Sequence, residues 1–472
     1  MSKDSKTFPL RFSGYHRRDV PAPDSELTST NPGTPMGEYM RRYWQPVCLS
    51  EELKDLPKAI RILGEDLVAF RAKNGSIGVM HLHCAHRGAS LEYGIVSENG
   101  IRCCYHGWHY AVDGTLQDAP CEHDATRLKD TVCQGAYPAF ERNGLVFAYM
   151  GPPEQKPPFP EFDSYTFPAD TKLVAFSNMY PCNWLQVYEN IMDHMHTAVL
   201  HNKMVAEGVD SDVAAGVSLE GFGDMPIMQW EATRGGNGCV FVAGRRLPEN
   251  TVWVRMTEMI FPNYLQIGSL LPTAARERHG NSGCTRWSVP VDDHNMIIFG
   301  FRHFNSTVDP DGLGDESECG YDKIDFLEGQ VGNRSYEEGQ RAPGDWEAIV
   351  SQRRIAVHSL EHPGGSDVGV YLCRRLLREA VRGKTAPDAL YEQLAAQGRT
   401  LPLYSQDSVL RVPELPRAED RKQILALGKK VLEIMRAADD CATPAERDAY
   451  VRRELDRIDG GLAVKAEEGA LA

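Results

Sequence analysis

Two cysteines and two histidines stand at a spacing that suits metal binding. Cys84 and His86 form a C-x-H pair, and after sixteen residues Cys103 and His106 form a C-x2-H pair. Such a set can hold a two-iron, two-sulfur cluster, in which two neutral imidazoles in place of two thiolates raise the reduction potential. The same residue types can hold a structural zinc ion. The spacing alone leaves both metals open.

A second group of metal-ligand residue types follows in the segment NWLQVYENIMDHMHTAVLHN. Asp193, His196 and His201 lie there in the pattern D-x2-H-x4-H. On a regular helix Asp193 and His196 share a face, but His201 does not return to it, so the helix must bend or end nearby. Two neutral imidazoles can ligate one metal; the alternative is an ordinary helix whose histidines face solvent.

Short strands punctuated by turns are expected around the first group, and a mixed α and β region around the second. Two strand-like runs flank Asn74-Gly75, a type I′ hairpin signal. The proline-dense stretch GPPEQKPPFPEFDSYTFP indicates a connector, and helical periodicity dominates after residue 370. The fold class is therefore α+β, and the predicted divisions are an N-terminal arm (1–44), an all-β domain (45–155), a catalytic domain (156–380) and a helical C-terminal extension (381–472).

Composition narrows the class of protein. The 472 residues are 42% hydrophobic and 25% charged, in the range of globular proteins of more than one domain. The net charge of -15 argues against nucleic acid as a partner. No apolar run suits a membrane span or a secretory signal, so a cytoplasmic location is expected. Twelve cysteines are too few for a disulfide scaffold.

The residues that flank the first group decide between iron and zinc. CAHRGASL and CCYHGWHYAVDG closely resemble the two ligand loops of Rieske domains, Cys-x-His-Arg-Gly and Cys-x-Tyr-His-Gly-Trp. The resemblance implies one [2Fe-2S] cluster whose first iron is held by Cys84 and Cys103 and whose second iron is held by His86 and His106. Cys104 is then a neighbour and not a ligand.

The second group resembles the mononuclear iron motif of aromatic ring-hydroxylating oxygenases. The resemblance implies one Fe(II) per subunit held by His196, His201 and a later carboxylate, for which GDWEAIVSQ offers Asp345, with Glu347 as the alternative. Two histidines and one carboxylate leave positions on Fe(II) open for the co-substrate O2. Asp193 is implied to bridge His196 and His106 of a neighbouring subunit, so that electrons can pass between them.

The likeness runs from GTPMGEY at residues 33–39 into the iron segment and again over residues 344–378. It is strongest to the phthalate-dioxygenase-like branch and, within it, to the dehydrodivanillate O-demethylase oxygenases. The resemblance implies a Rieske β domain joined to a helix-grip domain, in which a twisted antiparallel sheet wraps a helix. It also implies a homotrimer, or two trimers stacked as a hexamer.

The expected function is that of a terminal oxygenase that O-demethylates a small methoxylated aromatic acid by hydroxylating its methyl carbon. A separate NAD(P)H-dependent flavin and iron-sulfur reductase, with or without a ferredoxin, would supply electrons, because no G-x-G-x-x-G follows a strand. Cis-dihydroxylation of an aromatic carboxylate such as a phthalate is one alternative. A zinc-stabilised binding protein and an electron carrier without a working iron site are alternatives of other classes. Arg245, Arg246 and Arg255 could meet a substrate carboxylate, or they could be ordinary surface arginines.

Overall fold

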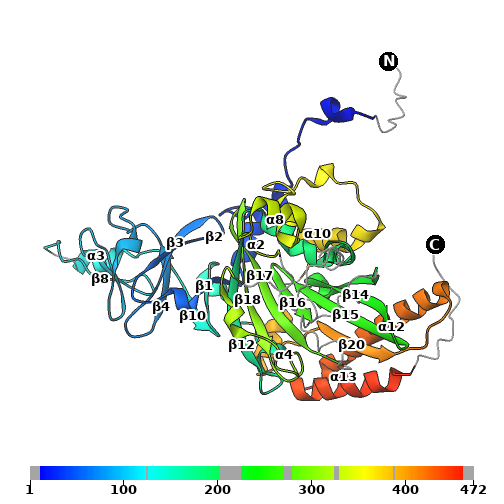
Figure 1. Ribbon diagram of the computed structural model, residues 1–472. Helices are drawn as coiled ribbons and strands as arrows, with labels where there is room; N and C mark the ends of the chain where they lie inside the picture. The colour runs from blue at the N-terminus through cyan, green and yellow to red at the C-terminus, as the bar shows by residue number, and fades with distance from the viewer. Residues whose placement is uncertain are drawn as a thin grey trace.

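The computed structural model describes residues 11–123, 126–201, 225–268, 279–323, 329–385 and 389–460. Figure 1 shows an elongated molecule in which a β-rich N-terminal region projects from a larger body built on one sheet. Among the described residues, no helix is long and apolar enough to cross a membrane.

Three small antiparallel sheets make up the projecting region. The first has the order β1-β11-β10, with strands Trp44–Leu49, Leu145–Tyr149 and Ala139–Arg142. The second has the order β2-β3-β4-β9, with strands Lys58–Ile62, Glu65–Arg71, Ile77–His81 and Ala136–Tyr137. The third has the order β5-β6-β7-β8, with strands Ile95–Val96, Gly100–Arg102, His109–Ala111 and Leu116–Asp118. The β character expected from the spacing of turn residues is confirmed, although the region also contains one short α-helix, α3 (Thr126–Thr131).

The hairpin expected at Asn74-Gly75 joins β3 to β4, but its turn is not type I′. A type I′ turn needs positive φ at both central residues, and of this pair Gly75 alone has one, at 89°. The Asn74 side chain instead accepts a hydrogen bond from the backbone N–H of Ser76 at 2.9 Å. The two residues still reverse the chain, with a different turn geometry.

One large sheet forms the body of the molecule. Its nine strands follow the order β13-β14-β15-β16-β17-β18-β12-β19, and β20 pairs with β15. All pairings are antiparallel except that of β12 with β19. The strands are Ile227–Thr233, Gly238–Leu247, Thr251–Ile260, Tyr264–Gly268, Ser282–Asp292, Asn295–Phe304, Lys172–Tyr180, Gly320–Tyr321 and Gln406–Arg411.

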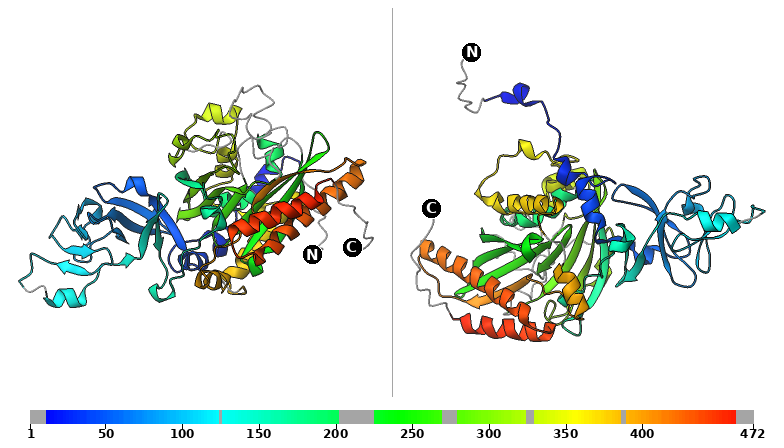
Figure 2. Two further views of the ribbon diagram at one scale, coloured as in Figure 1. Left: turned by 90° about the horizontal axis from the view of Figure 1, so that it is seen from below. Right: turned by 180° about the vertical axis from the view of Figure 1, so that it is seen from behind.

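Helices cover the two faces of this sheet, as Figures 1 and 2 show from three sides. On one face, α12 (Arg417–Ala437) and α13 (Pro444–Ile458) bury Ile424, Leu427 and Val431 against Val240 and Val242 of β14. On the other face, α10 (Val368–Val381) packs on β13 and β14, and α5 (Trp184–Glu189) packs on β17. The sheet therefore packs against α5, the helix that leads into the second group of candidate ligands, as the helix-grip resemblance implies.

The stretch predicted to be a helical extension also contains a strand. β20 (Gln406–Arg411) adds to the sheet beside the first half of β15, so this part of the chain completes the catalytic sheet. The pattern failed because Gln406, Asp407 and Ser408 are polar and yet fully buried, and their buried polar groups find partners in distant strands. A capping box formed by Thr443 and Glu446 begins α13.

Candidate metal centres and active site

The two loops of the cysteine and histidine group have the same backbone geometry. In each loop the cysteine N–H donates to the carbonyl five residues later, at 2.9 Å from Cys84 to Ala89 and 2.8 Å from Cys103 to Trp108. In each, a glycine four residues after the cysteine donates back to the cysteine carbonyl and has a positive φ, 74° at Gly88 and 75° at Gly107. The glycines therefore let both loops turn tightly around one centre.

The side chains of these loops form a sulfur pair and an imidazole pair. The thiols of Cys84 and Cys103 are buried and interact with each other, while the rings of His86 and His106 are partly exposed, with centroids 4.6 Å apart. The ring of His86 also stacks on Trp108, 4.5 Å away and nearly parallel. Buried cysteines and surface histidines suit a cluster with one inner and one outer iron.

A single zinc ion fits this arrangement poorly. Four ligands of one tetrahedral zinc have donor atoms close to one another. Among the described residues, two sets of three or more histidine, cysteine or acidic side chains have donor atoms all within 4.8 Å, and the cysteine and histidine group is neither of them. Two separate pairs are instead what a two-iron cluster needs, with its bridging sulfides between the irons.

Two buried groups hold the loops in place, and the sequence alone did not single them out. The hydroxyl of Tyr110 lies 3.2 Å from the sulfur of Cys84. The amide of Gln134 accepts a hydrogen bond from Ala85 N–H at 2.7 Å and donates to the carbonyls of His81 and His83. A hydrogen bond to a ligand sulfur adjusts the potential of a cluster.

The second group begins where α5 ends. Asn183 caps the start of α5 by accepting from Leu185 N–H, and it donates to the carbonyl of Thr28 in the N-terminal arm at 2.8 Å. The α-helix stops at Glu189 and continues as two 3₁₀ turns, η5 (Asn190–Met192) and η6 (His196–Ala198). This is the distortion that the spacing of His196 and His201 predicts, and it allows both rings to reach one point.

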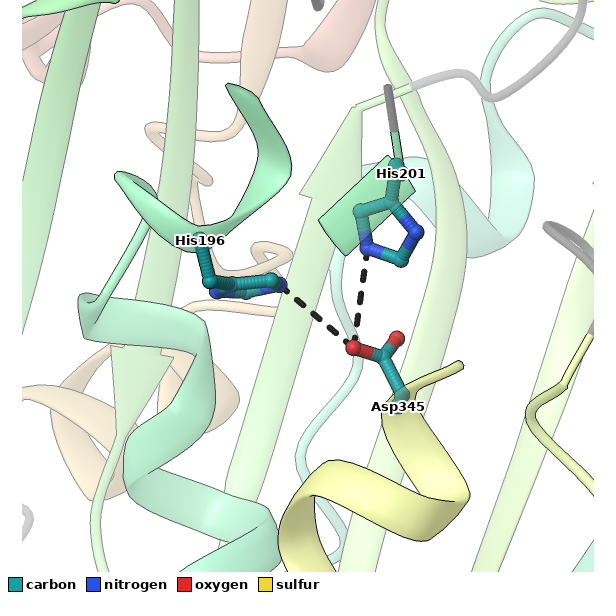
Figure 3. Close-up of side chains that lie close together, drawn as sticks. All are labelled: His196, His201 and Asp345. Atoms are coloured by element: carbon teal, nitrogen blue, oxygen red, sulfur yellow. Dashed lines mark ion pairs between the residues drawn. The ribbon is translucent and has the colours of Figure 1, made fainter. Parts of the chain in front are cut away.

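The structure brings His196, His201 and Asp345 together (Figure 3). The Nε2 atoms of His196 and His201 both lie 3.5 Å from Oδ1 of Asp345. Ligand atoms that share one metal at right angles, each roughly 2.1 Å from it, lie about 3 Å apart. Within the described chain, Asp345 Oδ1 is buried and has no hydrogen-bond partner, so the site fits a cation coordinated by two imidazoles and one carboxylate.

The charge states of the three side chains suit a ferrous ion. Burial alone would raise the pKa of Asp345, but the two imidazoles hold it well below its usual range, so the carboxylate is an anion. Burial lowers the pKa of His201. It would also lower the pKa of His196, but the Asp345 carboxylate raises it. The carboxylate therefore favours a positive charge beside it, which is a proton on His196 or a metal ion in its place. A metal ion bound there would displace that proton, because a histidine binds metal as the neutral imidazole. One anionic and two neutral donors are the set used by non-heme Fe(II) oxygenases.

Asp345 and Glu347 have different roles. Asp345 is the first residue of α9 (Asp345–Val350), and its Oδ2 accepts from Nε2 of Gln330 at 2.9 Å, which orients the carboxylate. Glu347 forms an ion pair with Arg334 and accepts from Gly344 N–H at 2.9 Å. Of the two carboxylates that the sequence offered, Asp345 therefore faces the histidines.

Asp193 contacts His196 through its backbone. The Nδ1 of His196 donates to the carbonyl oxygen of Asp193, which leaves Nε2 facing the centre. Asp193 lines an open polar cleft together with Glu189 and Arg374, and it is not among the residues that line the cavity beside His196, His201 and Asp345. Its predicted bridge to a cluster histidine of another subunit stays a prediction.

A cavity of about 790 Å³, counted out to its mouth, adjoins the three candidate ligands. Polar and apolar side chains both line it, and most of its exposed surface is apolar; the apolar residues include Val187, Ile191, Phe241, Leu265, Ile267, Ile298 and Ile349. Arg255 and Arg286 also reach it.

Sequence comparison gives the family. The profile of the Rieske [2Fe-2S] domain matches residues 43–133, and one described as "LigXa C-terminal domain like" matches residues 148–310. The chain is 57% identical over 457 residues to the tert-butanol monooxygenase / tert-amyl alcohol desaturase oxygenase subunit of Aquincola tertiaricarbonis, covering 96% of this chain and 97% of that one. The chain belongs to the Rieske non-heme iron oxygenases. It is an oxygenase subunit whose cofactors are a Rieske [2Fe-2S] cluster and a non-heme iron. This excludes the two alternative hypotheses, a zinc-stabilised binding protein and an electron carrier without a working iron site.

Other oxygenases are similar to the chain at lower sequence identity. The phenoxybenzoate dioxygenase subunit alpha of Ectopseudomonas oleovorans is 38% identical over 398 residues, covering 80% of this chain and 90% of that one. The 5,5′-dehydrodivanillate O-demethylase oxygenase subunit of Sphingobium is 38% identical over 182 residues, covering 38% and 42%. A crystal structure of dicamba monooxygenase has the same fold, with a TM-score of 0.51 at 17% identity, covering 73% of this chain and 98% of that one.

The three arginines considered for a substrate carboxylate all have protein partners. Arg245 donates to Nε2 of His194 at 3.2 Å and to the hydroxyl of Thr197 at 2.9 Å, and so it holds the turn that carries His196. Arg246 is paired with Asp420 and Arg255 with Asp407. Of the three, only Arg255 lines the cavity in the described chain. The role of Arg245 was missed because it depends on a contact between residues far apart in the sequence.

Proposed function

We propose that this chain is the terminal oxygenase of a multicomponent system and that it hydroxylates a methyl group of a small, branched, neutral alcohol. The observation that carries the proposal is the meeting of His196, His201 and Asp345 on the wall of a largely apolar cavity. Ferrous iron bound there supplies activation of dioxygen. The reaction consumes the substrate, O2, two electrons and two protons, and it gives the CH2OH product and water.

The substrate class is supported by the wall of the cavity and by the relative at 57% identity, which is named for tert-butanol and tert-amyl alcohol. Branched aliphatic side chains such as Ile191, Ile267 and Ile298 suit a compact alkyl group. The charge of Arg255 is balanced by Asp407, at 3.3 Å in a buried pair. A neutral alcohol can enter such a site without bringing an unbalanced charge into it.

O-demethylation of a methoxylated aromatic acid is the second candidate, because the same attack on a methyl C–H bond performs it. Arg286 in the cavity wall is a cation that could face a carboxylate. The relative named as a dehydrodivanillate O-demethylase subunit matches over 182 residues. Cis-dihydroxylation of an aromatic carboxylate is the third outcome that the experiment must separate.

The chain's own residues prepare the site for the reaction. Nδ1 of His196 donates to the Asp193 carbonyl, and Gln330 fixes the Asp345 carboxylate, so that both ligands present one atom each to the iron. The apolar wall excludes water around the substrate. Cys84, His86, Cys103 and His106 would hold the cluster that relays electrons.

A separate NAD(P)H-dependent reductase belongs to the same proposal, as does a cytoplasmic location, where that reductant is available. We also infer a homotrimer in which the iron-sulfur cluster of one subunit lies next to the cleft of the neighbouring subunit that is lined by Asp193, Glu189 and Arg374. Figure 1 supports this arrangement, because the β-rich region with β3, β4 and β8 projects away from the body that contains the large sheet.

The test is turnover by the iron-loaded protein with a Rieske reductase, NADH and O2. The panel contains tert-butanol, tert-amyl alcohol, methoxybenzoates and phthalate, and diols, formaldehyde and ring cis-diols are assayed together. A hydroxymethyl product from the alcohols, in step with NADH and O2 consumption, supports the proposal. Formaldehyde from methoxybenzoates alone would favour the second candidate, and ring cis-diols alone would favour dihydroxylation.

A further inference from the structure

Two buried hydroxyls in the cavity wall lack a hydrogen-bond partner. Thr257 and Ser288 are each 1% exposed, and neither Oγ has a partner in the part of the chain that the structure describes. Both residues line the cavity that His196, His201 and Asp345 also line. Because a buried hydroxyl without a partner is destabilising, such groups in a cavity wall call for a ligand that satisfies them.

The strand register turns both side chains toward the cavity. Alternate residues of a strand share one face of a sheet. The cavity-lining residues of the three central strands come in such pairs, two apart: Arg255 and Thr257 on β15, Leu265 and Ile267 on β16, Arg286 and Ser288 on β17. The opposite face of β15, with Val252, Val254 and Met256, is buried in the cluster beneath α12.

Of the two residues, Thr257 is the one close to the turn that carries His196. It is the direct cross-strand partner of Phe241 on β14, and such partners have Cα atoms about 5 Å apart. The ring of Phe241 stacks on that of His194, with centroids 4.6 Å apart. His194 is two residues before His196, so Thr257 is linked to the ligand segment through one stacked ring.

Ser288 lies in a different part of the wall. It is on β17, which β16 separates from β15, and its cross-strand partner is Ile298 on β18. From the spacing of strands and residues, its Cα is on the order of 15 Å from that of Thr257. A substrate with four or five carbons cannot reach both hydroxyls.

We propose that Thr257 hydrogen-bonds the hydroxyl of the substrate and thereby holds a methyl carbon toward the iron site. The inference rests on the proposed function and names the recognition group of that same cavity. A threonine hydroxyl both donates and accepts, so it matches an alcohol. Its neighbour Arg255 is already paired with the Asp407 carboxylate, so this part of the wall suits a neutral oxygen.

The chain offers a matched control for a valine substitution at Thr257. Thr233 on β13 is also buried, at 4% exposed, and its hydroxyl likewise has no partner among the described residues. It does not line the cavity. Threonine and valine have nearly the same shape, so Thr257→Val and Thr233→Val remove one buried hydroxyl each, and they differ in whether that hydroxyl faces substrate.

The experiment compares wild type, Thr257→Val, Thr257→Ser and Thr233→Val, each loaded with iron and cluster. KM and kcat for tert-butanol are measured, together with Kd from anaerobic equilibrium dialysis. One lost hydrogen bond predicts that Thr257→Val raises KM and Kd about fivefold. Thr257→Ser should stay within about twofold of wild type, because it keeps the hydroxyl. Thr233→Val should leave both constants unchanged.

The outcomes separate the two proposals. If wild type with both metal centres oxidises none of the alcohols, the proposed function fails, and this inference fails with it. If wild type turns them over and Thr257→Val keeps wild-type KM and Kd, the inference alone is overturned. An equal rise in Thr233→Val also overturns it, because the effect would then come from the folded state and not from substrate contact.

Discussion

Tyr110→Phe is expected to lower the reduction potential of the Rieske cluster. Tyr110 is 0% exposed, and its hydroxyl lies 3.2 Å from the sulfur of Cys84. Burial, together with the neighbouring Cys84, raises the pKa of Tyr110 far above its usual value, so the hydroxyl keeps its proton. A sulfur bound to iron has none, so the tyrosine is the donor.

The size of the shift follows from the charge difference between the two redox states. Reduction adds one electron to the cluster, which makes its sulfurs better acceptors and strengthens the bond from Tyr110. A net difference of about 1 kcal/mol, typical of one protein hydrogen bond, corresponds to about 40 mV for a single electron. Phenylalanine keeps the aromatic ring, which packs in the small hydrophobic core that also contains Cys84 and Trp108. The packing around the iron-sulfur cluster should therefore change little.

The assay is a redox titration followed by the EPR signal of the reduced cluster, with Tyr137→Phe as the control. Tyr137 lies in the same region, but its hydroxyl donates to Glu65 at 2.5 Å and not to a cysteine. We expect the potential to fall by about 40 mV in Tyr110→Phe and to stay at its wild-type value in Tyr137→Phe. An unchanged or higher potential in Tyr110→Phe with an intact cluster would refute the reasoning.

Four further predictions test other parts of the site. Asp345→Ala should lose the mononuclear iron and keep the cluster, whereas Glu347→Ala should keep both, as metal and sulfide analysis will show; iron retained in Asp345→Ala would rule this ligand out. Asp193→Asn should nearly abolish steady-state turnover with both metals bound, and normal turnover would remove its bridging role. Arg245→Gln should weaken iron binding about tenfold in a chelator competition, because it loosens the turn held at 2.9 Å through Thr197, and wild-type affinity would count against that. Burial lowers the pKa of His303 to about 3, so below about pH 6.5 this histidine takes up a proton in the unfolded chain and not in the folded one. The free energy of unfolding should then fall by up to about 1.4 kcal/mol for each pH unit. Urea denaturation at pH 7 and 5.5 should show a smaller fall for His303→Gln than for wild type, and an equal fall would contradict the prediction.

The cluster loops were predictable because each is a local motif. Cys84 to Ala89 and Cys103 to Trp108 close on themselves through two backbone hydrogen bonds and one glycine apiece. The geometry of each loop therefore depends on a few consecutive residues. The break after Glu189 was predictable for the same reason, since residues five apart cannot share a helix face.

The cavity was not predictable from the sequence, because it depends on register between distant strands. Thr257 faces Phe241 through the pairing of β14 with β15, and Asp345 arrives from a helix more than 140 residues after His196. Strand β20 could not be predicted from the sequence for the same reason. Trp253 Nε1 donates to Asp407 at 2.8 Å, and such tertiary partners allow a polar sequence to form a buried strand.

The segment from Glu189 to His201 separates two hollows with different chemical character. On one side lies the apolar cavity with His196, His201 and Asp345. On the other lies an open cleft that is lined by Asp193, Glu189 and Arg374. Arg374 donates to both oxygens of Glu189, at 2.6 and 2.5 Å, and so fixes the end of α5. The backbone carbonyl of Asp193 contacts His196, so the cleft at Asp193 is connected to the iron site through that carbonyl and the His196 ring. On the proposed mechanism, electrons and substrate therefore enter from opposite sides of one turn, so that changes at Thr257 should alter KM and changes at Asp193 should alter kcat.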